Sequence, residues 1–125
     1  MLRYILFVGV GGFFGSIARY ALNIWMGRLS APIFPFSTLL INVIGCLMIG
    51  LIYSLADRNR LASPEVLLLL GTGFCGSFTT FSAFALENLG MFNRGETGFA
   101  LAYIGLSLVL GLLAVYGGIL AGKLF

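Results

Sequence analysis

The stretch GTGFCGSFTTFS, residues 71–82, lies at the centre of a hydrophobic segment that runs from Val66 to Phe92. It contains three glycines and five hydroxyl residues. A helix over the whole segment would be roughly 40 Å long at about 1.5 Å per residue, which exceeds the ~30 Å of bilayer hydrocarbon. Each glycine weakens a helix by about 1 kcal/mol, and hydroxyl groups can bond the backbone groups that a break releases. We therefore expect a break in this helix near Gly76 to Thr79, at mid-depth in a membrane.

Two interpretations of the break remain open from the residues alone. Broken spans expose carbonyl groups and half-helix ends, and transport proteins hold ions at such places. A kinked packing helix, whose hydroxyl groups bond back to the preceding turn, would have the same composition. The glycines at 71, 73 and 76 also match the pattern G-x-G-x-x-G. A dinucleotide site needs a preceding strand and a soluble fold, so this match predicts no nucleotide site.

The rest of the chain predicts an integral membrane protein. Hydrophobic residues make up 60% of the 125 residues and charged residues only 9%, whereas a soluble domain has about 25% charged residues. This composition excludes a soluble enzyme, a nucleic-acid-binding module and a disordered tail. Backbone groups must be satisfied within lipid, so each long apolar segment is expected to be a helix. We predict one all-α transmembrane domain over residues 1–125, with spans at 4–26, 36–55, 66–92 and 98–122.

The charges orient these spans only weakly. An even number of spans places both termini on one side of the membrane. That side would carry Arg3, Arg58, Arg60 and Lys123, and the other side Arg28 and Arg94, with Arg19 near it. So small a bias leaves two possibilities open under the positive-inside rule: a single orientation with cytoplasmic termini, or insertion both ways as an antiparallel homodimer. The pairs Gly11-x-x-x-Gly15 and Gly118-x-x-x-Gly122 match a helix-packing pattern and suggest a homo-oligomer.

Polar side chains recur at helical spacing inside the spans. Thr38 and Asn42 share one face of the second span, as Tyr103 and Ser107 do on the fourth. Such groups either join helices by hydrogen bonds or line a wet path through the protein. Glu87 and Arg19 lie near span ends, where they can anchor at the interface, pair with each other or serve transport.

With Asn42 in the second span and GGFFGSIARY (residues 11–20) in the first, the stretch GTGFCGSFTTFSAFALE (residues 71–87) resembles the fluoride channels of the Fluc (CrcB) family. The resemblance covers essentially the whole chain. It implies a dual-topology antiparallel homodimer in a bacterial inner membrane, with two pores that passively export cytoplasmic fluoride. It also implies a structural sodium ion at the dimer centre, held by the main-chain carbonyls of Gly76 and Thr79.

The same resemblance assigns roles to individual residues. The two pore phenylalanines fall on Phe81 and Phe84, and the vestibule arginine falls on Arg19. The implied fluoride pathway comprises Thr38, Asn42, Phe81, Ser82, Phe84, Glu87, Tyr103 and Ser107. Two positions depart from many relatives, since Gly111 and Ala83 stand where hydroxyl residues are common. Each would remove a hydrogen-bond donor from one end of the implied pathway, Gly111 beyond Ser107 and Ala83 around Glu87.

Two other functions compete with a channel. Small multidrug exporters are also four-span, dual-topology dimers, but they depend on an acidic residue in the first span, and the only charged residue within this first span is Arg19. A packing subunit of a larger complex would use its polar residues only to join helices. The chain has no histidine, and no acid–base pair stands at mid-depth, so we do not expect an enzyme.

Overall fold

The computed structural model describes residues 1–27, 33–58 and 63–124. Three uninterrupted helices are α1 (Leu2–Gly27), α2 (Phe36–Asp57) and α6 (Thr97–Gly122). The third hydrophobic segment is divided into α3 (Pro64–Leu67), the π-helical stretch η1 (Leu68–Cys75), α4 (Gly76–Phe78) and α5 (Phe81–Asn93). Four helical segments of the described chain are long and apolar enough to cross a membrane. The chain is therefore all-helical, as predicted.

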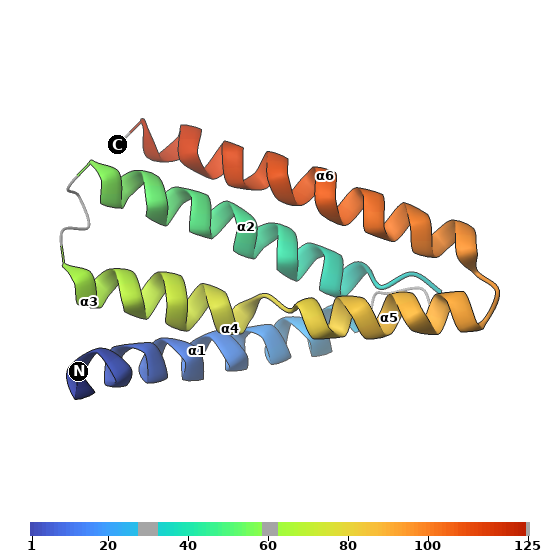
Figure 1. Cartoon of the computed structure of the whole chain (residues 1–125), viewed down its shortest axis with the longest axis horizontal. Coiled ribbons are helices and arrows are strands. Elements are labelled where there is room, and N and C mark those ends of the chain that lie inside the picture. The colour runs from blue at the N-terminus through green and yellow to red at the C-terminus, as the bar shows by residue number, and fades with distance from the viewer. Residues whose placement is uncertain (28–32, 59–62, 125) are drawn as a thin grey trace.

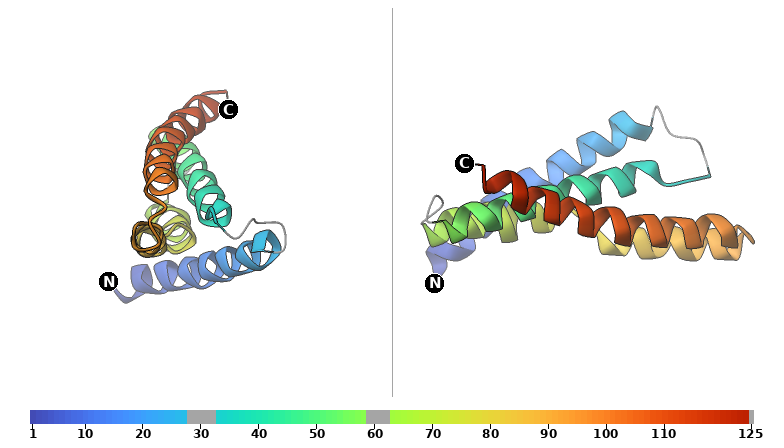
Figure 2. Two further views of the ribbon diagram at one scale, coloured as in Figure 1. Left: turned by 90° about the vertical axis from the view of Figure 1, so that its right-hand side faces the viewer. Right: turned by 90° about the horizontal axis from the view of Figure 1, so that it is seen from above.

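The helices pack as two pairs that run side by side (Figure 1). Helix α2 lies along α6, while α1 lies along η1 and α4. Helix α5 continues beyond the interruption and meets the first half of α6. Both termini lie at the same end of the bundle. The end-on view in Figure 2 shows that α1 stands on the outer side of the third segment, away from α6.

Both predicted small-residue pairs mark close helix contacts, but these contacts lie within one chain. A Cβ atom at Gly11 or Gly15 would overlap main-chain oxygens of η1. On the other helix pair, a Cβ atom at Gly118 would overlap the carbonyl oxygen of Leu47 in α2. Glycine therefore allows the backbones to approach within each pair. Because the chain uses both motifs internally, they lend no support to the predicted homo-oligomer.

One ion pair lies at the end of the bundle that carries the two termini. Helix α3 begins at Pro64 after the cap position Ser63, and the Ser63 hydroxyl donates to Glu65 Oε2 at 2.5 Å instead of accepting from the backbone. Glu65 also pairs with Arg3 at 3.2 Å and so ties the third segment to α1. Of the charges used to predict orientation, Arg28 and Arg60 lie outside the described residues.

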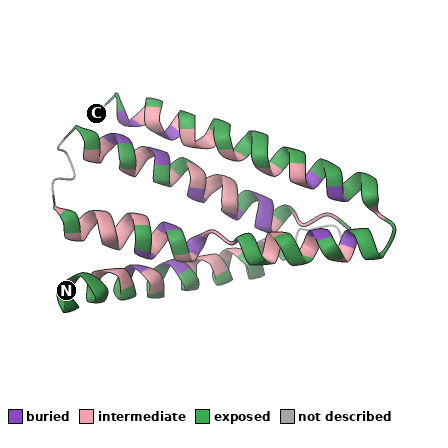
Figure 3. Cartoon of the chain, in the orientation of Figure 1, coloured by how far each residue is buried: buried purple, intermediate pink, exposed green. Residues whose placement is uncertain are grey.

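The interior is small, and the outside of the chain is apolar. The core cluster consists of Leu39, Met91, Ala100 and Tyr103, close to where α2, α5 and α6 meet. Large hydrophobic side chains are exposed along the helices, for example Phe13 at 63% and Leu112 at 72% (Figure 3). Exposed apolar surface of this extent is unfavourable in water, so it requires lipid or another protein chain as its surroundings.

Candidate functional site

The third segment loses its helical backbone at two threonines. Thr79 has φ −76° and ψ 158°, and Thr80 has φ −148° and ψ 118°, so both are extended. Gly76, where the sequence placed the start of the break, still has helical angles. The threonine side chains close the two helix ends: Thr79 Oγ1 donates to the Cys75 carbonyl at 2.9 Å, and Thr80 Oγ1 accepts from the Ala83 N–H at 3.2 Å. Thr80 is thus the N-cap of α5.

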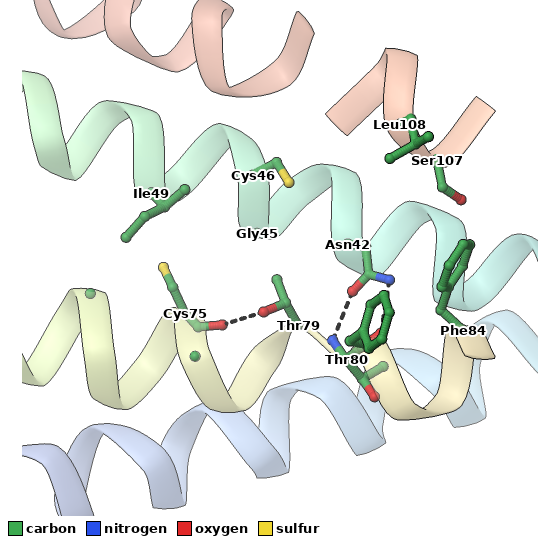
Figure 4. A pocket seen from close by; sticks show the side chains of 13 residues that line it. Asn42, Gly45, Cys46, Ile49, Cys75, Thr79, Thr80, Phe84, Ser107 and Leu108 are labelled. Atoms are coloured by element: carbon green, nitrogen blue, oxygen red, sulfur yellow. Dashed lines mark hydrogen bonds between the residues drawn. The ribbon is translucent and has the colours of Figure 1, made fainter. Parts of the chain in front are cut away.

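Asn42 of α2 makes hydrogen bonds to the backbone at the interruption. Its Oδ1 accepts from the Thr80 N–H at 2.8 Å, and its Nδ2 donates to the Thr80 carbonyl at 3.1 Å (Figure 4). One amide side chain therefore replaces both backbone partners that Thr80 loses when it leaves the helix. An amide nitrogen carries two N–H groups, so one remains for another acceptor.

Glu87 of α5 receives hydroxyl groups from two other helices. Thr38 Oγ1 donates to Oε1 at 2.6 Å, and the Tyr103 hydroxyl donates to Oε2 at 2.7 Å. Both donors are buried, with 2% of Thr38 and 0% of Tyr103 exposed. Arg19 does not pair with this carboxylate, since the ion pairs in the described ranges are Arg3–Glu65 and Arg94–Glu96. Glu87 is therefore held by neutral donors.

Aromatic rings connect this cluster to the interruption. The ring of Phe84 lies 5.0 Å from that of Tyr103 and 5.8 Å from that of Phe81, measured between centroids. Phe84 is partly buried against the core cluster, whereas Phe81 is 80% exposed. The two predicted pore phenylalanines are thus neighbours, with one inside the chain and the other at its surface.

A cavity of about 420 Å³ opens between α2, the interrupted segment and α6. Figure 4 shows its lining, with Asn42 and Ser107 on one side and Thr79 on the other. The predicted residues that line it are Asn42, Gly76, Thr79, Phe81, Phe84 and Ser107. None of its lining residues is charged. Ser107 Oγ is buried and has no hydrogen-bond partner among the residues that the structure describes.

The remaining predicted residues lie elsewhere. Ser82 and Arg19 line a second cavity, of about 440 Å³, next to α1. Glu87 borders a third cavity, of about 340 Å³, together with Arg94. Ser82 and Glu87, which both belong to the implied fluoride pathway, thus line different cavities. The predicted set is therefore divided among the first cavity, the Glu87 cluster and the space beside α1.

Three residues of the site were not singled out in the sequence. Asn42 makes its hydrogen bonds to the backbone of Thr80. The position of Thr80 before an apolar run is a recognisable N-cap signal. Gly45 lies one turn after Asn42 and contacts Thr79. Asn88 is 6% exposed and donates to the Phe84 carbonyl at 2.8 Å, while its Oδ1 has no partner within the described chain. No pattern in the sequence points to Gly45 or Asn88.

Comparison with known proteins identifies the family. The model of the family described as CrcB-like protein, Camphor Resistance (CrcB), matches residues 6–119. A Chlorobium chlorochromatii protein named Fluoride-specific ion channel FluC is 45% identical over 96% of this chain and 92% of its own length. Proteins of the same name from Rhizobium etli and Chlorobaculum tepidum are 47% and 43% identical, over 91% and 100% of this chain and 91% and 98% of their own lengths. These matches confirm the resemblance seen in the motifs, and the chain belongs to the CrcB-like family.

Proposed function

We propose that this chain is a fluoride-selective channel through which fluoride that accumulates in a bacterial cell leaves down its gradient. Relatives that share more than two fifths of their residues with nearly the whole chain are named fluoride-specific ion channels. The observation in the structure that carries the proposal is the uncharged lining of the cavity between α2 and α6. The family is one of ion channels, so the chain is not an enzyme.

The chemistry of this lining suits a small anion. Fluoride is strongly hydrated, so a path for it needs hydrogen-bond donors that replace water. Ser107 Oγ is unpartnered within the described residues, and Asn42 has a second N–H. The positive edges of the Phe81 and Phe84 rings can face an anion as well. A fixed cation would hold the ion more tightly, and conduction requires that each site also releases it.

The assembly we propose is a dual-topology antiparallel homodimer with two pores in the bacterial inner membrane. The weak charge bias along the chain allows insertion in both orientations. Phe81 lines the cavity and is 80% exposed in the single chain, so a second chain can complete the wall at this point. In this assembly the interruption at Thr79 and Thr80 lies at mid-membrane, where its backbone is enclosed by protein.

A structural sodium ion at the dimer centre belongs to the same proposal. The carbonyl oxygens of Gly76 and Thr79 from each chain would hold it, and oxygen ligands suit a hard cation. Within the described part of the chain, no hydrogen bond reaches either oxygen. A continuing helix would have bonded the Gly76 carbonyl to the Thr80 N–H, which instead donates to Asn42. The available oxygens therefore fit a cation, whose positive charge would balance the carbonyl dipoles at the interruption.

The test is ion efflux from proteoliposomes of the purified protein, measured with a fluoride electrode beside a chloride electrode. The proposal predicts rapid fluoride release without chloride release. A folded dimer that releases no fluoride would refute it. Ethidium efflux driven by a proton gradient is the corresponding assay for the exporter alternative.

A further inference from the structure

We infer that Gly45 is a positioning residue of the channel: because it has no side chain, it admits the Thr79 methyl group and thereby fixes the extended backbone of the interruption. The inference deepens the proposed function, because the backbone concerned carries the carbonyl groups proposed for sodium and borders the proposed fluoride path. It assigns a role to a residue that bears no side-chain polar group.

The contact lies on the same face of α2 as Asn42. Gly45 is buried one turn after Asn42, and both residues face the interruption (Figure 4). A Cβ atom at position 45 would overlap Thr79 Cγ2 and would lie 3.4 Å from Cδ1 of Phe78. The space that glycine leaves is therefore filled by one methyl group of one threonine.

Thr79 cannot move this methyl group away by rotating its side chain without losing a bond. Its hydroxyl donates to the Cys75 carbonyl at 2.9 Å, which fixes the side-chain rotamer. Threonine is branched at Cβ, so the rotamer that makes this bond also determines where the methyl group points. A Cβ atom at position 45 would therefore have to displace the backbone of Thr79 or break this hydrogen bond.

Helix α2 thus holds two successive residues in two different ways. Thr79 is located by its methyl group in the space at Gly45, and Thr80 by the two hydrogen bonds of Asn42. Both threonines are extended, so a shift of Thr79 turns its carbonyl and also strains the bonds that Asn42 makes to the next residue. Gly45→Ala should therefore change ion handling at the interruption.

A double-mutant cycle between Gly45→Ala and Thr79→Ser tests this contact. Serine keeps the hydroxyl that donates to Cys75 and removes only the methyl group that meets position 45. We expect Gly45→Ala to lower fluoride efflux at least tenfold in the wild-type background, and less than twofold in the Thr79→Ser background. Gly117→Ala is the matched control on the α2–α6 pair, because its Cβ atom would lie 3.8 Å from Cδ1 of Leu47, an ordinary contact.

A second measurement separates positioning from simple loss of packing. The midpoint of thermal unfolding is compared in sodium chloride and in N-methylglucamine chloride for the same variants. We expect sodium to raise the midpoint of the wild type, to raise that of Gly45→Ala much less, and to regain its effect in the double variant. If Gly45→Ala alone fails to fold, a double variant that folds as a dimer and regains the sodium effect supports the inference. A double variant that also fails to fold overturns it.

The inference is overturned if Gly45→Ala has the same effect in both backgrounds, or if it behaves like Gly117→Ala. It is also overturned if Gly45→Ala lowers the unfolding midpoint without altering its dependence on sodium. Failure of the proposed function would look different, because the wild type itself would then release no fluoride. In that case, the double-mutant cycle can still be measured with unfolding midpoints, and it then tests the contact between Gly45 and the Thr79 methyl group independently of fluoride efflux.

Discussion

Removing the hydroxyl group of Tyr103 should destabilise the folded chain more than any other loss of a single tyrosine hydroxyl from the described spans. Tyr103 is fully buried, and its hydroxyl donates to Glu87 Oε2 at 2.7 Å. Tyr103→Phe deletes this donor and keeps the ring, so the packing against Phe84 at 5.0 Å is preserved. The substitution therefore isolates one hydrogen bond to a carboxylate.

The magnitude follows from the two donors around Glu87. A hydrogen bond to a charged group contributes about 1.5–3 kcal/mol. A charged side chain at the centre of a membrane helix costs about 2.5–3.5 kcal/mol, and less towards the interface. The two hydroxyl donors together can offset a cost of this size. Tyr103→Phe should accordingly lower the free energy of unfolding by about 1.5–3 kcal/mol.

Reversible unfolding by dodecyl sulfate in mixed micelles measures this difference. The matched control is Tyr116→Phe, which removes a hydroxyl from the same helix at a residue that is 60% exposed. We expect the control to change the free energy of unfolding by less than about 0.5 kcal/mol, as is usual for surface substitutions. If the two variants unfold at the same dodecyl sulfate fraction, the bond between Tyr103 and Glu87 does not stabilise the fold, and the reasoning fails.

Three further predictions concern the cavity and the packing. Replacing Phe81 or Phe84 by isoleucine should reduce fluoride efflux while gel filtration still shows the dimer, because the ring edges are lost; unchanged efflux in both variants would remove the rings from the mechanism. Asn42→Asp should stop efflux, since it places negative charge on the proposed path; a conducting variant would argue against that path. Gly118→Ala should lower the free energy of unfolding by about 1–3 kcal/mol through overpacking against α2, whereas Gly117→Ala should be close to neutral; equal values would contradict the observed helix contact.

The helices themselves could be predicted because they depend on local properties of the chain. Long apolar segments must form helices in lipid, and the observed helices begin and end within two residues of the predicted spans. The start of α3 at Pro64 follows from the fixed φ of proline. These features require no knowledge of which helix lies next to which.

The position of the interruption could not be predicted as well, because it depends on a neighbouring helix. The sequence drew attention to glycines, yet Gly76 remains helical and the backbone opens at Thr79 and Thr80. Leaving the helix deprives Thr80 of two hydrogen bonds, and the partners that replace them come from Asn42 of α2. A glycine lowers the cost of opening a helix anywhere nearby, whereas a partner on another helix determines where it opens.

The division of the polar residues likewise requires the three-dimensional structure. Helical spacing correctly places Thr38 and Asn42 on one face of α2, since both point towards the third segment. They nevertheless contact different features, because Thr38 meets the carboxylate of Glu87 and Asn42 meets the backbone of Thr80. Spacing along one helix cannot distinguish these partners, which lie seven residues apart in the chain.

This division leaves few donors for an ion in the proposed channel, and that scarcity fits conduction. Thr38 and Tyr103 direct their hydroxyl hydrogens to Glu87, and Thr79 directs its own to Cys75. The hydroxyl of Ser107 and the second N–H of Asn42 remain as donors at the cavity. An anion held by one or two neutral donors is bound weakly enough to be released to the next site. The polar groups that shape the interruption and the donors that would meet fluoride therefore overlap only at Asn42.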